Sequence, residues 1–217
     1  MIVAIDGPAG AGKSTVARKV ARALGLAFLD TGAMYRAVTL VVLEKGIHPS
    51  NAQGCAAVAR STELAFDADG RIWIDGVRGE PDIRSRTVTL NVSAVSAHPE
   101  VREAVVALQR RIAERPPGVV AEGRDTTTVV FPDADHKFFL TASPEERARR
   151  RAAELGTPER AGEIRQELEQ RDEQDSRRAH SPLVHAPEAV LLDTDRLSVD
   201  EAVAAVLEAV RTGSSAR

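Results

Sequence analysis

The sequence predicts an α/β protein with a five-stranded, mostly parallel sheet and helices on both faces. Three observations support this fold class. Five short apolar segments alternate with segments of helical periodicity. The first of these strands runs directly into a glycine-rich turn that opens a helix. A β-meander interrupts the alternation once, and we interpret it as an insert into the α/β pattern.

The expected elements follow from periodicity and end signals. The core strands are predicted at residues 2–5, 27–29, 119–121, 137–140 and 189–193. Helices are predicted at residues 16–24, 34–45, 51–60, 88–96, 99–114, 161–179 and 199–210, and a further helix begins after Ser143. Residues 63–74 alternate around a turn at residues 68–70, which indicates a β-hairpin, and residues 77–83 are a candidate third strand.

The turn after the first strand fits the pattern G-x-x-x-x-G-K-[ST] at every fixed position. Its glycines can adopt positive φ angles, so successive amide groups can curl around an anion at the start of a helix. In such a P-loop, Lys13 reaches the β- and γ-phosphates, Ser14 gives its hydroxyl to Mg²⁺, and Thr15 is placed to contact the α-phosphate. The predicted triphosphate-binding residues are Gly7, Pro8, Ala9, Gly10, Ala11, Gly12, Lys13, Ser14 and Thr15. The alternative is a glycine-rich turn without a ligand.

Composition excludes several classes of protein. The chain has 217 residues and a net charge of −3, so it is no basic nucleic-acid binder. No apolar run approaches the roughly 20 residues of a membrane span. Cys55 is the one cysteine, which excludes a disulfide framework and is typical of a cytoplasmic chain. We expect no nucleic-acid partner and no membrane partner.

Charged residues follow two other predicted strands. Tyr35 and Arg36 lie in the helix after strand 27–29, and Arg124 and Asp125 come directly after strand 119–121. Ligands of parallel sheets sit at the carboxyl ends of the strands, which favours a binding role for these residues. The alternatives are a surface arginine with a packed tyrosine at the first position and a salt bridge within the turn at the second.

The helix predicted at 161–179 carries charge on its apolar side. Ile164 and Leu168 mark that side, and Arg171, Asp175 and Arg178 continue the same stripe at helical spacing. An exposed face of ion pairs would lie opposite the apolar stripe. Because these residues lie in line with it, we favour a pocket for a polyanion.

A third basic cluster comprises Arg147, Arg149, Arg150 and Arg151 on the first turns of the helix after Ser143, where Arg147, Arg150 and Arg151 share one face. Like charges at this spacing repel, and cations oppose the dipole at a helix N-terminus. An anion under a closing lid would offset both effects. A solvated helix face is the alternative.

Together, a P-loop and a second arginine-rich site indicate phosphoryl transfer from a nucleoside triphosphate to a second phosphate. A switch GTPase would need an Asn-Lys-x-Asp motif to read guanine, and the chain has no Asn-Lys pair. Two alternatives stay open: a regulatory module that binds ATP without transfer, and a kinase for another small acceptor such as adenylate or shikimate.

Over nearly its whole length the sequence resembles the bacterial cytidylate kinases, the monomeric P-loop enzymes that phosphorylate CMP and dCMP with ATP and Mg²⁺. The matching segments are residues 5–15, 30–36, 91–93, 99–103, 123–125, 129–133, 171–172 and 178–179. The chain departs from the family pattern at Thr126-Thr127, where Met-Gly is expected, and at Thr31, which replaces a serine.

The resemblance implies a role for each matching residue. Thr31, Ser93, Arg102 and Asp125 would read cytosine, whose exocyclic amine suits a carboxylate acceptor. Arg36, Arg124 and Arg178 would hold the acceptor phosphate, and Arg171 and Asp175 would contact the sugar, with Tyr35 packing nearby. Arg147, Arg150 and Arg151 would belong to the lid, and we expect Lys13, Arg150 and Arg151 to be catalytic.

The resemblance also implies a division into parts. The core P-loop domain is expected to comprise residues 1–35, 88–145 and 180–217. The nucleoside-monophosphate region would span residues 36–87, with the β insert at 61–87. Residues 146–179 would form the lid and its flanking helix.

Overall fold

The structure, a computed structural model, describes residues 1–67 and 69–213. Contacts divide the chain into two compact units: unit 1 is Met1–Leu26 with Val119–Arg217, and unit 2 is Ala27–Gly118. Residues 88–118, expected with the core domain, fall in unit 2. The helices of that stretch pack on other helices of unit 2: α4 (Arg86–Ala97) packs on α2 (Thr31–Glu44), and α5 (Pro99–Ala113) packs on α3 (Ala52–Ser61).

The main sheet has five strands in the order β2-β6-β1-β7-β8. Its strands are β1 (Ile2–Asp6), β2 (Ala27–Asp30), β6 (Val119–Gly123), β7 (His136–Thr141) and β8 (Val190–Asp193). Strand β1 pairs in parallel with β6 and β7, and β7 pairs in parallel with β8. The predicted five-stranded α/β class is confirmed.

Burial explains why the central strands read as continuous apolar runs. Val3, Ala4 and Ile5 of β1 are fully buried, as are residues 119–121 of β6. Strands covered on both faces lose the alternation that marks half-exposed strands. The parallel register places Asp6 opposite Gly123, so the last residues of β1 and β6 lie side by side.

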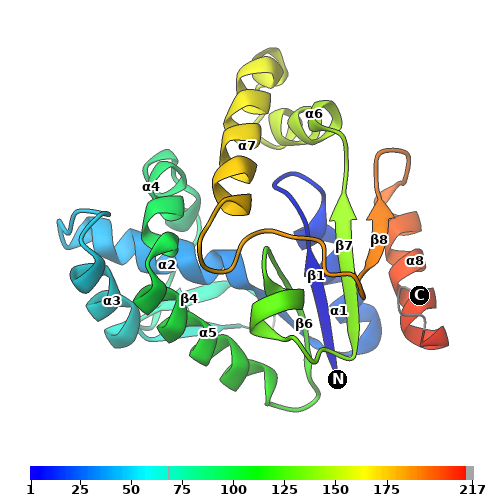
Figure 1. Cartoon of the computed structure of the whole chain (residues 1–217), viewed down its shortest axis with the longest axis horizontal. Helices are drawn as coiled ribbons and strands as arrows, with labels where there is room; N and C mark the ends of the chain where they lie inside the picture. The colour runs from blue at the N-terminus through cyan, green and yellow to red at the C-terminus, as the bar shows by residue number, and fades with distance from the viewer. Residues whose placement is uncertain (68, 214–217) are drawn as a thin grey trace. The chain divides into compact units, whose positions relative to one another are not determined.

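Unit 1 also contains the helices α1 (Lys13–Leu24), α6 (Pro144–Glu154), α7 (Ala161–Ser176) and α8 (Val199–Thr212). Helix α1 packs on α8, and α6 packs on α7. Ala148, Ala152, Ile164 and Leu168 form a small apolar cluster with Ala9 of the P-loop. Figure 1 shows α6 and α7 beyond the carboxyl end of β7. This cluster therefore connects the predicted lid to the predicted phosphate site.

Unit 2 contains α2 (Thr31–Glu44), α3 (Ala52–Ser61), α4 (Arg86–Ala97) and α5 (Pro99–Ala113), together with a short 3₁₀ helix, η1 (Asp82–Arg84). The insert is an antiparallel meander of β3 (Leu64–Phe66), β4 (Ile72–Ile74) and β5 (Val77–Arg78). The predicted hairpin is present, but the third strand, expected over residues 77–83, ends at Arg78, and η1 follows at Asp82. Position 68 of its hairpin turn lies outside the described residues.

Two local features differ from expectation. Helix α2 begins at Thr31, because the side chain of Asp30 accepts a hydrogen bond from the Ala33 amide at 2.8 Å and caps it. After β6 the chain forms a short π-helix, η2 (Thr126–Val130), which the sequence analysis did not predict. In the part of the chain that the structure describes, no helix combines the length and the apolar character needed to span a bilayer.

Candidate active site

The P-loop connects β1 to α1 through residues 7–12. Gly7 has a φ of 147°, and a Cβ there would lie 1.9 Å from the Leu140 carbonyl oxygen, so only glycine fits. Gly12, with φ 85°, precedes the first turn of α1, which has no side-chain cap. The N-terminus of α1 is therefore free of a competing side chain, as a phosphate site requires.

Lys13 is buried inside this loop. Its Nζ donates a hydrogen bond to the Pro8 carbonyl oxygen at 2.9 Å. Burial and, next, the neighbouring Arg124 lower the pKa of Lys13 to about 7, although Glu122 and Asp172 act in the opposite direction. A polyphosphate beside Lys13 would favour its charged form, since an anion stabilises a nearby ammonium group. The loop is thus built to receive negative charge.

Ser14 contacts Glu122, an acid that the sequence-based prediction of the site did not include. The Ser14 hydroxyl donates to Glu122 Oε1 at 2.6 Å, and Glu122 is buried at the end of β6. A hydroxyl and a carboxylate are the oxygen ligands that Mg²⁺ prefers, in company with phosphate oxygens. The described residues contain no group of three or more His, Cys, Asp or Glu side chains that could hold a metal alone. The pair therefore fits a metal that arrives with a nucleotide.

Arginines gather around one buried carboxylate in unit 1. Asp175, only 1% exposed, accepts a hydrogen bond from Arg124 Nε at 2.9 Å and forms an ion pair with Arg178. Burial opposes ionisation of Asp175, but Arg124 and Arg178 lower its pKa. Arg171 and Asp175 lie on α7 as predicted, but the helix ends at Ser176, before the predicted residue 179. Arg178 therefore pairs with Asp175 from just beyond the end of α7, and Arg124 joins the cluster from the segment after β6.

Arg171 gives this cluster its excess of positive charge. Burial, and then Arg124, lowers the pKa of Arg171 to about 10. Its Nε is buried, and no described residue forms a hydrogen bond with it. The guanidinium groups of Arg124, Arg171 and Arg178 thus lie near Asp175, which is the direct carboxylate partner of Arg124 and Arg178. Such a cluster suits an anionic ligand, which would supply the missing acceptors.

Asp125 begins η2 and is 4% exposed. Its backbone oxygen accepts from the amides of Val129 and Val130 at 2.9 and 3.1 Å, and the second of these is a bond between residues five apart, as in a π-helix. Its neighbour Arg124 extends to Asp175 on α7. The backbone of Asp125 is therefore fixed by η2, and the side chain of Arg124 is fixed by α7.

The lid arginines have protein partners. Arg147 is buried, donates to the Ala9 carbonyl oxygen at 2.9 Å and pairs with Asp172, and Asp172 accepts from the Ala9 amide at 3.0 Å. Arg150 binds Glu146 and Thr194. The repulsion that we expected an anion to offset is already offset by these protein partners. Arg147 braces the P-loop, a contact between distant segments that helical spacing does not reveal.

Unit 2 holds the other predicted residues. Arg36 of α2 donates to the Thr89 hydroxyl at 2.9 Å. Arg102 of α5 lies over the ring of Tyr35, 5.1 Å from its centroid, and donates to the Ser96 carbonyl oxygen. Both arginines are buried. The structure thus brings together Tyr35 and Arg102. The two other predicted residues of this unit lie on separate helices, Thr31 at the start of α2 and Ser93 on α4.

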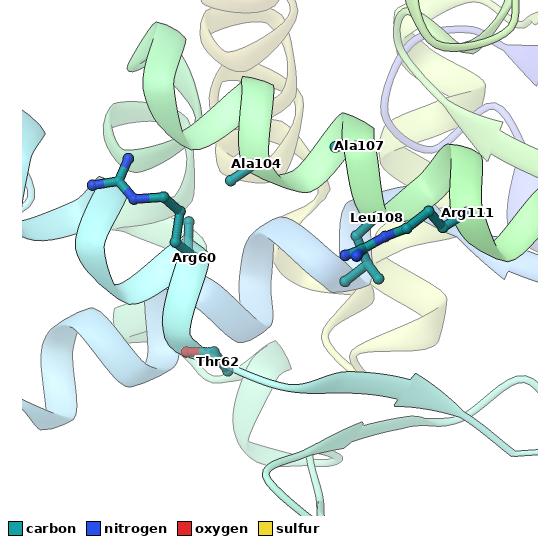
Figure 2. A pocket seen from close by; sticks show the side chains of 7 residues that line it. Arg60, Thr62, Ala104, Ala107, Leu108 and Arg111 are labelled. Carbon is teal, nitrogen blue, oxygen red and sulfur yellow. The ribbon is translucent and has the colours of Figure 1, made fainter.

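A surface hollow of about 360 Å³ lies between α3 and α5, away from these residues. Figure 2 shows its lining, which includes Leu108 and the side chains of Arg60 and Arg111. Small apolar groups and exposed arginines make up this surface. None of the predicted site residues lines it.

A family model described as cytidylate kinase matches residues 3–212. Among curated proteins, the chain is 50% identical over 212 residues to a cytidylate kinase of Caldanaerobacter subterraneus subsp. tengcongensis, covering 96% of this chain and 94% of the relative. It is 46% identical over 219 residues to a cytidylate kinase of Mycobacterium leprae, covering 100% and 98%. A crystal structure of an uncharacterized protein from Eubacterium ventriosum, 12% identical, aligns over 98% of this chain and 99% of its own with a TM-score of 0.55, a likeness of fold alone.

Proposed function

The chain belongs to the cytidylate kinase family, and we propose that Lys13, Arg150 and Arg151 are its catalytic residues in the phosphorylation of CMP and dCMP by ATP. The bond from the γ-phosphorus of ATP to its bridging oxygen breaks as a CMP phosphate oxygen forms the new bond. The observation that carries this assignment is the combination of an intact P-loop with a second, arginine-rich site around Asp175.

Catalysis by these residues would consist of positioning and charge stabilisation. The transferred group carries negative charge on its peripheral oxygens, and preorganised donors stabilise it without reorganisation. Residues 7–15 bind the ATP phosphates, and Lys13 leaves its contact with Pro8 to reach them. Arg150 and Arg151 come from α6, next to the brace formed by Arg147 and Asp172 on Ala9. Closure of this helix over the phosphates would exclude water.

Ser14 and Glu122 would hold Mg²⁺ together with the ATP phosphates. The ion would neutralise charge on the β- and γ-phosphates. The Ser14 hydroxyl oxygen and Glu122 Oε1 are already neighbours, because a 2.6 Å hydrogen bond joins them.

A Glu122→Gln variant tests this metal site. The amide keeps the shape of the side chain but loses the anionic oxygen beside Ser14. We expect the Mg²⁺ concentration for half-maximal activity to rise by about tenfold or more, measured by titration at saturating nucleotide. Glu208→Gln, an exposed change on α8, is the control. An unchanged Mg²⁺ requirement in Glu122→Gln would remove Glu122 from the site.

The remaining predicted site residues would bind the acceptor. In this proposal Arg36, Arg124 and Arg178 bind the phosphate of CMP, Arg171 and Asp175 bind the sugar, and Tyr35 packs nearby. Thr31, Ser93, Arg102 and Asp125 read the base. The position of Asp125 supports base reading, because it is buried and lies two residues after the end of β6, the strand paired with the P-loop strand β1, where α/β proteins bind ligands.

An Asp125→Ala variant tests the base-reading role. Loss of an acceptor for the cytosine amine removes discrimination worth about 1–3 kcal/mol, or roughly ten- to a hundredfold in kcat/KM for CMP. The KM for ATP should change little, and the preference for CMP over UMP should shrink. Asp133→Ala, an exposed acid downstream, is the control. Equal losses toward CMP and ATP would count against Asp125 as a reader of the base.

A panel of acceptors tests the function as a whole. Product formation from CMP, dCMP, UMP, AMP and shikimate with MgATP is compared in a coupled assay. We expect CMP and dCMP to be used well above the others. Protection by ATP without any product would instead support a regulatory module. The proposal further includes a monomeric, cytoplasmic enzyme. The single cysteine, Cys55, supports a cytoplasmic location, because one cysteine cannot form a disulfide within the chain.

A further inference from the structure

Asp6 is a buried carboxylate to which the proposed mechanism gives no role. It is the last residue of β1, it is 0% exposed, and it directly precedes Gly7 of the P-loop. Burial raises the pKa of Asp6, and hydrogen bonds from Thr127 and Thr126 offset this only in part. An acid at such a position disfavours folding unless donors satisfy it. Its contacts therefore call for an explanation.

Four donors converge on this one side chain. Asp6 Oδ1 accepts from the Thr126 amide at 2.9 Å and from the Thr126 hydroxyl at 2.7 Å. Oδ2 accepts from the Thr127 amide at 2.7 Å and from the Thr127 hydroxyl at 2.6 Å. Each carboxylate oxygen thus binds one threonine through two donors. The two hydroxyls belong to the pair that stands in place of Met-Gly, residues that could offer amides alone.

The contacts of Asp6 lie on either side of Arg124 and Asp125, the two residues of this segment that are assigned to the acceptor site. The parallel register places Asp6 opposite Gly123 in the sheet. The side chain of Asp6 holds Thr126 and Thr127. Arg124 and Asp125 lie between these two attachments, so both ends of their segment are fixed to one residue of β1.

Asp6 also takes over a role that Asp125 would ordinarily fill. An aspartate at the N-cap of a helix commonly accepts a hydrogen bond from the first free amides. Asp125 occupies the N-cap of η2 but forms no side-chain cap. The first amides of η2 bind Asp6 instead. This leaves the carboxylate of Asp125 without a capping role at its own helix.

We propose that Asp6 is a positioning residue for the acceptor site: by capping η2 in place of Asp125, it fixes Arg124 and Asp125 next to the P-loop. The hydroxyls of Thr126 and Thr127 are the part of this attachment that side-chain replacement can remove. The inference rests on the roles proposed above for Arg124 and Asp125.

The first test replaces the hydroxyls. A Thr126→Val/Thr127→Val double variant keeps the side-chain shape and both amides. Thr128→Val is the matched control, because the Thr128 hydroxyl is buried and no described residue forms a hydrogen bond with it. We expect the double variant to raise the KM for CMP several-fold, to change the KM for ATP less, and to accelerate amide exchange at residues 124–127. The control should leave all three unchanged.

The second test changes Asp6 itself. In Asp6→Asn one acceptor oxygen becomes an amide that faces two donors, which breaks half of the attachment. Misplacement of reacting groups by about 1 Å can cost on the order of a hundredfold in rate. We therefore expect kcat/KM for CMP to fall by about ten- to a hundredfold, with the loss concentrated in the KM for CMP. If this variant does not fold, the threonine variants still decide the question.

Several outcomes would overturn the inference. A purely structural Asp6 would lower the melting temperature and the fraction of active enzyme but leave the KM for CMP unchanged far below that temperature. Equal effects of the double variant and Thr128→Val would show that the bonds to Asp6 do not matter. If Asp125→Ala and Arg124→Lys leave the KM for CMP unchanged, the roles proposed for Asp125 and Arg124 fail instead. Exchange at residues 124–127, measured in the same Asp6 and threonine variants, distinguishes that failure from loss of the attachment.

Discussion

The Lys13→Met variant is expected to lose about 10²–10³-fold in kcat for CMP phosphorylation, the size of effect that follows removal of one preorganised donor at developing charge. Lys13 is the cation inside the P-loop, and its contact with the Pro8 carbonyl oxygen shows that it can be held at the loop. Methionine keeps the length and the apolar stem of the side chain. Steady-state kinetics at saturating CMP and MgATP measure the loss.

Lys19→Met is the control for this change. Lys19 lies on the same helix, where its exposed side chain pairs with Asp200 at 2.7 Å. Exposed pairs of this kind contribute little to stability. Near-normal kcat in Lys19→Met, alongside the loss in Lys13→Met, would assign the effect to the P-loop. A Lys13→Met enzyme with kcat within a few-fold of the wild type would contradict direct participation of Lys13 in transfer.

Asp175→Ala is expected to lower the free energy of unfolding by about 3–5 kcal/mol, as when one partner of a buried ion pair is removed. Asp175 is 1% exposed and is the direct carboxylate partner of Arg124 and Arg178. Its loss leaves Arg124 and Arg178 without their direct carboxylate partner and close to Arg171, with Asp172 and Glu122 as the remaining acids near Arg124. Urea unfolding of the two proteins measures the difference. Glu173→Ala, which breaks an exposed pair with Arg177 on the same helix, should change stability by less than about 1 kcal/mol.

Two further results are expected for Asp175→Ala. Sulfate should raise the melting temperature of this variant more than that of the wild type, because an anion replaces the missing carboxylate. The arginines lower the pKa of Asp175 although burial opposes them, so its stabilisation is present above the unfolded pKa of about 4 and is lost as the pH falls below it. The Asp175→Ala variant should lack this part of the loss of stability at acidic pH. A loss of stability below about 1 kcal/mol would contradict the charge network.

The sequence predicted those parts of the site that depend on neighbours along the chain. The P-loop needs one strand, six loop residues and a helix start, and all of these are local. The shared face of Arg171 and Asp175 follows from helical spacing, and the structure places Asp175 on the buried side as expected, whereas Arg178 lies beyond the last residue of α7, Ser176. The hairpin of the insert follows from alternation and a turn. The spacing of residues along a helix or strand directly determines which side chains share a face.

Other features depended on segments that lie far apart in sequence. The hydrogen bond from Ser14 to Glu122 spans 108 positions, and the brace from Arg147 to Ala9 spans 138. The basic cluster on α6 was interpreted from repulsion alone, but its acidic and carbonyl partners come partly from other elements. No spacing rule identifies such partners, because they are brought together by strand order and helix packing.

The fold class, the phosphate loop and the family could be predicted from the amino-acid sequence, since each depends on short contiguous patterns of residues. The partners of the buried carboxylates emerged from the three-dimensional arrangement: Glu122 accepts from Ser14, Asp172 accepts from the P-loop, Asp175 pairs with arginines and Asp6 caps η2. The physical reason is that a buried charge is tolerated only beside specific partners. Those partners are selected by the packing of distant elements and not by neighbours in the chain.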